Sequence, residues 1–271
     1  MHAMKPAALC FACLFTFTSP ALAQWPAFPA PNLVRTADGK VDLNAPPPRV
    51  DGKPDLSGLW RPRPDPLGKV EGVENTVFAR YMDNLTADAG PDPLAILKPE
   101  YVELVRGRLE PLGLHDPINR CAPPGALRLL SLPPPTKIVQ ARGLVLLLHE
   151  KETTFRQIFT DGRELPANPH PTFMGYSVGR WEGDTLVVTS SGFTEQSWLD
   201  GMGHPHSEAM RTTERYRRID AGHLQVEITV TDPQVLKAPI TATQHYLLIP
   251  DGELIEYYCT ENEKDMTHYA K

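Results

Sequence analysis

The 271-residue sequence predicts a mainly β protein, in which an antiparallel up-and-down barrel of about eight strands follows a Pro-rich, partly helical N-terminal extension. Three observations predict this fold. From Thr136 onward, β-rich runs are joined by short turns that contain Gly or Asp. Twenty of the 29 prolines lie between Pro26 and Pro135, and proline removes a donor that a sheet needs. Apolar and polar residues alternate over 224–230, as they do in a half-buried strand.

The first 23 residues have the pattern of a cleaved signal peptide. Lys5 precedes a short apolar run at 7–15, and Ala21-Leu22-Ala23 forms an A-x-A cleavage site with the cut after Ala23. The run is shorter than the roughly 20 residues that a membrane-spanning helix needs. We therefore expect a periplasmic or secreted protein that has no membrane span and uses no nucleotide cofactor.

Residues 24–135 form the expected extension. An extended arm at 24–52 precedes a short strand at 55–60. Apolar residues four apart predict a helix at 74–85. A second helix is predicted at 99–109, because Pro99 suits a first turn and the apolar residues of this segment share one face.

Residues 136–271 form the expected antiparallel barrel domain, built from sequential hairpins. The paired runs are 138–140 with 144–149, 176–181 with 185–190, 210–219 with 224–231, and 240–249 with 253–259, with one more strand at 155–160. A barrel of this strand number can hold one small ligand.

Two cysteines follow the leader, Cys121 and Cys259, and in an oxidising compartment they most simply form one disulfide. It would contribute ~4–5 kcal/mol in the chain-entropy model. The alternative is a reactive thiol or a metal ligand. The formal net charge of −6 gives no attraction for nucleic acid or anionic lipid, so we expect a small-molecule ligand or substrate as partner. The sequence does not specify an oligomeric state.

Gly175 to Gly179 matches the G-x-S-x-G motif of serine hydrolases, with Ser177 at its centre. That motif needs a strand, a sharp turn and a helix. Here it runs into a predicted β-hairpin, so the motif argues weakly for a nucleophile.

The segment His204-Pro205-His206-Ser207-Glu208 is the sharpest chemical signal. In an extended chain His204, His206 and Glu208 fall on one side, where they could hold a divalent metal. The alternative is a polar loop whose histidines cap backbone groups.

The turn at 220–222 sets a register for the two strands around it. Tyr216 would lie opposite Val226, and Glu214 and Thr212 would then point into the barrel. A carboxylate inside a barrel indicates either a ligand pocket, in which Glu214 could act as an acid or base, or an ion pair with an interior Arg.

Further candidates flank these strands. In the last hairpin His245 and Glu256 would share a face, which points either into the cavity or to solvent. Trp198 lies in a Gly-rich loop that could form a lid or simply anchor a long connection. Asp200 and Tyr176 could position a substrate beside His206 and Glu214.

Four stretches together resemble a family of exported bacterial proteins with no established activity. They are residues 51–60, the hairpin MGYSVGRWEGDTLVV at 174–188, WLDGMGHPHSE at 198–208, and 256–259. The resemblance implies export and a single fold. The meander is also similar in architecture to lipocalin-like barrels, which does not establish a function.

Three functions are compatible with these observations. The first is a small-molecule-binding barrel with a His- and Glu-containing pocket, whose ligand-contacting residues would be Trp198, Thr212, Tyr216, His245 and Glu256. The second is a lyase, isomerase or hydrolase that uses His206 and Glu214 as acid and base, with or without a metal. The third is an envelope scaffold protein that binds through its Pro-rich arm.

Overall fold

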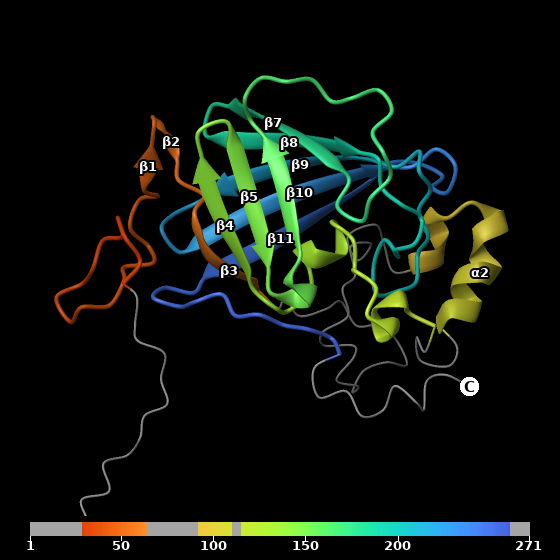
Figure 1. Cartoon of the computed structure of the whole chain (residues 1–271), viewed down its shortest axis with the longest axis horizontal. Helices are drawn as coiled ribbons and strands as arrows, with labels where there is room; N and C mark the ends of the chain where they lie inside the picture. The colour runs from red at the N-terminus through yellow and green to blue at the C-terminus, as the bar shows by residue number, and fades with distance from the viewer. Residues whose placement is uncertain (1–28, 64–91, 110–114, 261–271) are drawn as a thin grey trace, which may run out of the picture.

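The computed structural model describes residues 29–63, 92–109 and 115–260. Its centre is a closed barrel of nine strands (Figure 1), so the prediction of a mainly β barrel protein is confirmed. The barrel strands are β3 (Gly58–Pro62), β4 (Thr136–Ala141), β5 (Leu144–His149), β6 (Phe155–Phe159), β7 (Tyr176–Glu182), β8 (Thr185–Ser191), β9 (Arg211–Arg218), β10 (His223–Thr231) and β11 (Ile240–Leu248). The signal peptide and the predicted helix at 74–85 lie outside the described residues.

The order around the barrel is β10-β11-β3-β4-β5-β6-β7-β8-β9. Neighbouring strands are antiparallel except β6 and β7, which run parallel and pair at two positions. The expectation of a purely antiparallel barrel is therefore corrected. Residues 160–175 connect β6 to β7, and a connection of that length lets the chain return and enter β7 in the same direction.

The predicted strand at 253–259 is wrong, and β3 takes the place beside β11. Trp60 of β3 is fully buried, and its indole Nε1 donates to the Leu56 carbonyl at 3.0 Å. Burial of this ring stabilises β3 in the barrel, so the extension contributes a strand to the domain it precedes.

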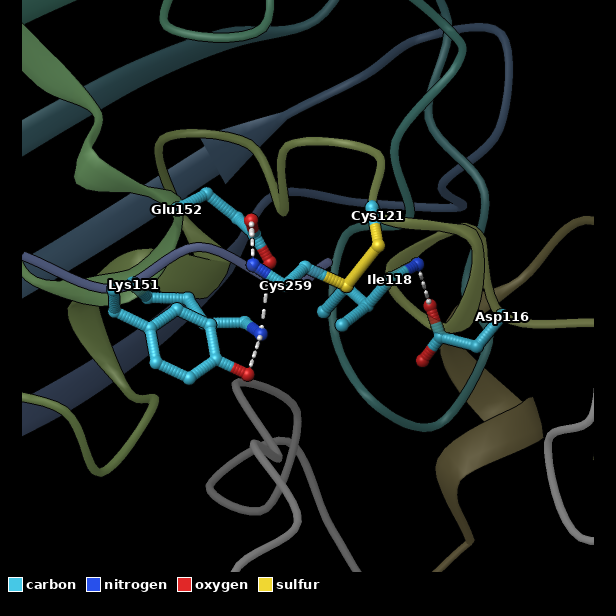
Figure 2. The surroundings of a disulfide bond; sticks show 7 residues. Asp116, Ile118, Cys121, Lys151, Glu152 and Cys259 are labelled. Carbon is cyan, nitrogen blue, oxygen red and sulfur yellow. Dashed lines mark hydrogen bonds and ion pairs between the residues drawn. A yellow bond between two sulfur atoms is a disulfide. The ribbon is translucent and has the colours of Figure 1, made fainter. Parts of the chain in front are cut away.

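A disulfide joins Cys121 to Cys259 with 5.5 Å between the Cα atoms, which confirms the predicted bond. Figure 2 shows it beside the Lys151–Glu152 turn that precedes β6. The Cys259 amide donates to Glu152 at 3.3 Å, and Lys151 donates to the Tyr257 hydroxyl at 3.2 Å. These contacts hold residues 253–259 against the end of β5, away from the position that the hairpin prediction gave them.

The shorter elements surround the barrel. They are the strand pair β1 (Arg49–Val50) and β2 (Lys53–Pro54), the helix α2 (Pro99–Leu109), and the 3-10 turns η2 (Pro93–Ile96), η3 (Pro117–Arg120), η4 (Arg128–Leu130) and η5 (Lys151–Thr153). The helix predicted at 99–109 is thus confirmed. Within the described ranges, no helix is long and apolar enough to cross a membrane.

The predicted register of β9 and β10 is confirmed. Tyr216 pairs with Val226, Glu214 with Ile228 and Thr212 with Val230. Leu224, Val226, Ile228 and Val230 are all buried, so this face of β10 lines the barrel core. Glu214 and Thr212 share that face and are buried as well.

One end of the barrel is closed by the segment 192–210, which links β8 to β9. Figure 1 shows α2 on the side of the barrel where this segment folds. Arg108 of α2 donates to the Gly203 carbonyl at 2.8 Å. The hydroxyl of Tyr246, from inside β11, donates to the Leu130 carbonyl of η4 at the same end. These contacts join α2, η4 and the segment 192–210 into a cap on the barrel.

Candidate functional site

The barrel interior holds an ion pair between Arg156 of β6 and Glu214 of β9. Arg156 donates to the two carboxylate oxygens at 2.6 and 2.9 Å, and both side chains are buried. Burial lowers the pKa of Arg156, but the charge of Glu214, together with Tyr216 and the hydrogen bonds, raises the pKa above its ordinary value. The interior Glu is therefore held by an interior Arg, one of the two alternatives that the sequence left open.

Polar neighbours complete this interior network. Arg156 also donates to Ser177 at 3.0 Å and to Ser190 at 2.9 Å. Glu214 accepts from the Tyr216 hydroxyl at 2.6 Å and from Thr212 at 3.2 Å. Burial and the nearby charge of Glu214 raise the pKa of Tyr216 well above its ordinary value, so the phenol remains protonated.

The interior network has the arrangement expected of a structural ion pair, not of a ligand-binding site. The Glu214 carboxylate accepts from Arg156, Tyr216 and Thr212, so its lone pairs are directed at the protein itself. Ser177 lies in the β7–β8 hairpin and contacts Arg156, so its G-x-S-x-G motif forms no nucleophile elbow. A buried pair with matched hydrogen bonds is the arrangement in which two charges can stay desolvated.

The cap segment is held by two carboxylates. Asp200 accepts from the Met202 amide at 3.0 Å and contacts the His204 ring at 2.8 Å. Asp232 accepts from the Ser207 amide at 2.6 Å and from its hydroxyl at 2.8 Å. Held at residues 202–204 and at Ser207, the segment buries most of its side chains rather than forming an open loop.

A pair of polar side chains, Ser197 and His206, lies inside the cap. The Ser197 hydroxyl and His206 Nε2 are 3.0 Å apart, and both residues are buried. His206 Nδ1 faces the Ser207 carbonyl at 3.4 Å, and a carbonyl can only accept. Nδ1 therefore carries the proton in this arrangement, and Nε2 accepts from Ser197. Burial lowers the pKa of His206, which favours the neutral ring.

A small cavity adjoins this pair. Its volume is about 10 Å³, room for about one water molecule. The lining residues are mainly apolar and include several aromatic rings: Gly125, Ala126, Leu127, Phe173, Phe193, Ser197, Trp198, Leu199, His206 and Met210. We call this cavity and its lining the cap site.

Gly125 brings the 121–130 segment close to Ser197. Its φ is +92°, and a Cβ atom at this position would lie 2.7 Å from the Ser197 hydroxyl oxygen. An L side chain would be both strained and obstructed here. Glycine therefore sets the distance between the two walls of the cap site.

Two arginines lie over the Trp198 ring in the cap site. The guanidinium carbon of Arg108 is 5.0 Å from the ring centroid and that of Arg128 is 6.0 Å from it. Arg128 forms a bidentate pair with Asp116, at 2.6 and 2.8 Å. Burial lowers the pKa of Arg108, and Asp116 partly offsets this.

The predicted metal ligands do not converge. His204 contacts Asp200, His206 contacts Ser197, and Glu208 is exposed. Among the described residues, no group of three His, Cys, Asp or Glu side chains is arranged to hold a metal ion. The two histidines point to different partners because the segment folds back on itself through the His204–Leu199 backbone contact at 2.8 Å. The proposed metal set is thereby corrected.

The other predicted site residues do not gather in one place. Glu214, Thr212 and Tyr216 belong to the interior network, whereas Asp200, His206 and Trp198 belong to the cap. The expected partnership of His206 with Glu214 is not formed, since each is bonded to other residues. Tyr176 contacts Arg163 at 3.1 Å, and His245 and Glu256 are exposed.

Three residues of these clusters were missed by sequence reasoning: Ser197, Arg108 and Arg156. Ser197 directly precedes Trp198, which was singled out, but nothing in the sequence placed it opposite His206. The abundance of Arg near Glu214 in the sequence suggested an interior Arg partner, but not that this partner is Arg156 of β6. No protein-family model and no curated protein matches the chain.

Proposed function

We propose that the protein is an exported small-molecule-binding β-barrel protein that takes a small, partly apolar ligand at the cap site. The observation that carries this proposal is the Ser197–His206 pair beside a cavity with aromatic walls. Binding sites for small molecules combine apolar walls with a few placed polar groups, which is the composition found here.

The site has the polar chemistry to orient a neutral ligand. The Ser197 hydroxyl gives its proton to His206 Nε2, and its oxygen can still accept a hydrogen bond from a ligand donor. A ligand larger than a water molecule needs more space than the cavity holds. Met210 and Trp198 line it, and the flexible thioether side chain of Met210 is the wall that adapts most easily.

Export is supported by the disulfide and by the leader pattern of residues 1–23. The Cys121–Cys259 bond persists in the oxidising compartments outside the cytoplasm. Mass spectrometry of the protein recovered from its host tests export. Cleavage after Ala23 supports it, and an intact N-terminus in the cell interior contradicts it.

Ligand binding is tested with three neutral aromatic probes: benzamide, 2-phenylacetamide and 3-phenylpropionamide. We expect at least one to bind the full mature chain and to shift the NMR signals of the Trp198 indole and of the Ser197 amide. His206→Gln should weaken that binding about tenfold, whereas His245→Gln, a change at an exposed histidine, should not. Failure of all three probes to shift cap signals would overturn the proposal.

A second candidate is a hydrolase that uses Ser197 as nucleophile and His206 as base. The observation that favours it is the orientation of the imidazole, with Nδ1 toward the Ser207 carbonyl and Nε2 toward Ser197. A fluorophosphonate probe tests it: the Ser197 oxygen would bond to phosphorus, fluoride would leave, and His206 would take the proton. Labelling that is lost in Ser197→Ala and His206→Gln supports the hydrolase, and an unlabelled wild type contradicts it.

A further inference from the structure

Arg108 has hydrogen-bonding capacity that the described part of the chain leaves unused. A guanidinium has five N–H donors. Arg108 directs one nitrogen to the Gly203 carbonyl at 2.8 Å and lies 5.0 Å above the Trp198 ring. No carboxylate within residues 29–63, 92–109 and 115–260 forms an ion pair with it. Both carboxylate oxygens of the nearby Asp116 instead accept hydrogen bonds from Arg128.

The charge of Arg108 reaches the cap site. It is one of the groups that lower the pKa of His206, although burial of the ring has the larger effect. The carboxylates that act on His206 in the opposite sense, Asp232 and Glu195, accept hydrogen bonds from the amides of Ser207 and Glu208. Among the described residues, the Asp116 carboxylate near Trp198 is hydrogen-bonded to Arg128 and not to Arg108.

Half-burial makes the positive charge of Arg108 costly when no carboxylate among the described residues pairs with it. Burial lowers its pKa, which shows that the surroundings disfavour the charged form. An anion at this position would accept hydrogen bonds from the remaining N–H donors of Arg108. A carboxylate matches the fork of a guanidinium with two parallel hydrogen bonds.

From this geometry we infer that the cap site selects ligands that carry a carboxylate on an aromatic or apolar body, and that Arg108 binds the carboxylate. The inference rests on the proposed function, because it names the substrate class of the same site. The apolar body lies against Trp198 in the cavity, beside the Ser197–His206 pair, and Arg108 is the residue that determines specificity for the charge.

The test compares acids with amides of the same shape on the full mature chain. Benzoate, phenylacetate and 3-phenylpropionate are titrated beside benzamide, 2-phenylacetamide and 3-phenylpropionamide, with binding followed by NMR. We expect each bound acid to bind about tenfold more tightly than its amide, as charge-assisted hydrogen bonds imply. Arg108→Gln should remove this preference, so that each acid binds no more tightly than its amide.

Arg106→Gln is the matched control. Arg106 lies on the same helix but is exposed and paired with Glu103, so its loss should leave the acid preference intact. Equal binding of acids and amides, with His206→Gln weakening both, would overturn the inference and leave the proposed function standing. Loss of the preference in Arg106→Gln as well would also overturn it, since general charge attraction would then explain it. Absence of any probe from the cap would overturn both proposals.

Discussion

The barrel interior and the cap site are both buried and both polar, but they use their polar groups differently. Inside the barrel, Arg156 and Glu214 direct their hydrogen bonds at each other and at neighbouring hydroxyls. In the cap, Ser197 and His206 adjoin a cavity, and Arg108 keeps donors unused within the described residues. The contrast teaches that a buried charge alone does not locate a binding site. Unused hydrogen-bonding capacity beside open volume is the better guide.

The largest effect should come from breaking the interior ion pair. Arg156→Ala leaves the buried Glu214 carboxylate without its countercharge, and we expect the free energy of unfolding to fall by about 3–5 kcal/mol. Urea denaturation measures it. The control is Arg215→Ala on the same sheet, an exposed partner of Glu182, which should cost about 1 kcal/mol or less. Similar losses in the two variants would contradict a structural role for the interior pair.

Removal of the disulfide should have the next largest effect. Cys121→Ser with Cys259→Ser frees a loop of 138 residues, and we expect a loss of about 2–4 kcal/mol. Because Cys121 precedes the Gly125 wall of the cap, amide hydrogen exchange should rise more at Gly125 than at Arg156 of the barrel. Equal increases at both positions would show that the cap and the barrel open as one unit.

His149, a buried residue of β5, should make stability depend on pH. Burial and the nearby charge of Arg156 lower its pKa from 6.5 to about 3. The unfolded chain therefore binds a proton below pH 6.5 that the folded protein does not. The stability present above pH 6.5 is lost as the pH falls toward 3, with a slope of about 1.4 kcal/mol per pH unit.

His149→Gln tests this between pH 4.5 and 6.5, a range chosen to lie above the ordinary pKa values of carboxyl groups. The wild-type slope should exceed that of the variant by about 1 kcal/mol per pH unit. The sign is opposite to that of a histidine stabilised by protonation, so a wild type that becomes more stable on acidification would contradict the account. Gln is used because its amide can still contact Thr136, which lies 2.8 Å from Nδ1.

The smallest effect on stability should come from the cap. Ser197→Ala removes one neutral hydrogen bond beside a cavity, and we expect a loss of about 1 kcal/mol. The same change should weaken amide binding by about tenfold, as His206→Gln does. A loss as large as that of Arg156→Ala would mean that the cap pair is structural too, and the comparison between the two regions would fail.

The sequence predicted what depends on local pattern. The turn at 220–222 set the register of β9 and β10, and alternation placed Glu214 and Thr212 inside. The run of hairpins from Thr136 onward predicted a barrel because short turns join neighbouring strands.

What the sequence did not predict depends on contacts between distant segments. β3 closes the barrel because Trp60 is buried there, and Cys259 is held beside Cys121, away from β11. The approach of Ser197 to His206 requires the whole segment 192–210 to fold around Asp200 and Asp232. Periodicity reports which face of a strand is buried, but it does not report which residue lies across from a loop.

The most direct test of the central claim is an NMR titration of the isotope-labelled mature chain with 3-phenylpropionate. We expect the signals of Ser197, the Trp198 indole and Arg108 to shift with one common affinity, while those of Arg156 and Glu214 stay in place. Shifts centred on Arg156 and Glu214 would contradict it, because the barrel interior, not the cap, would then be the binding site.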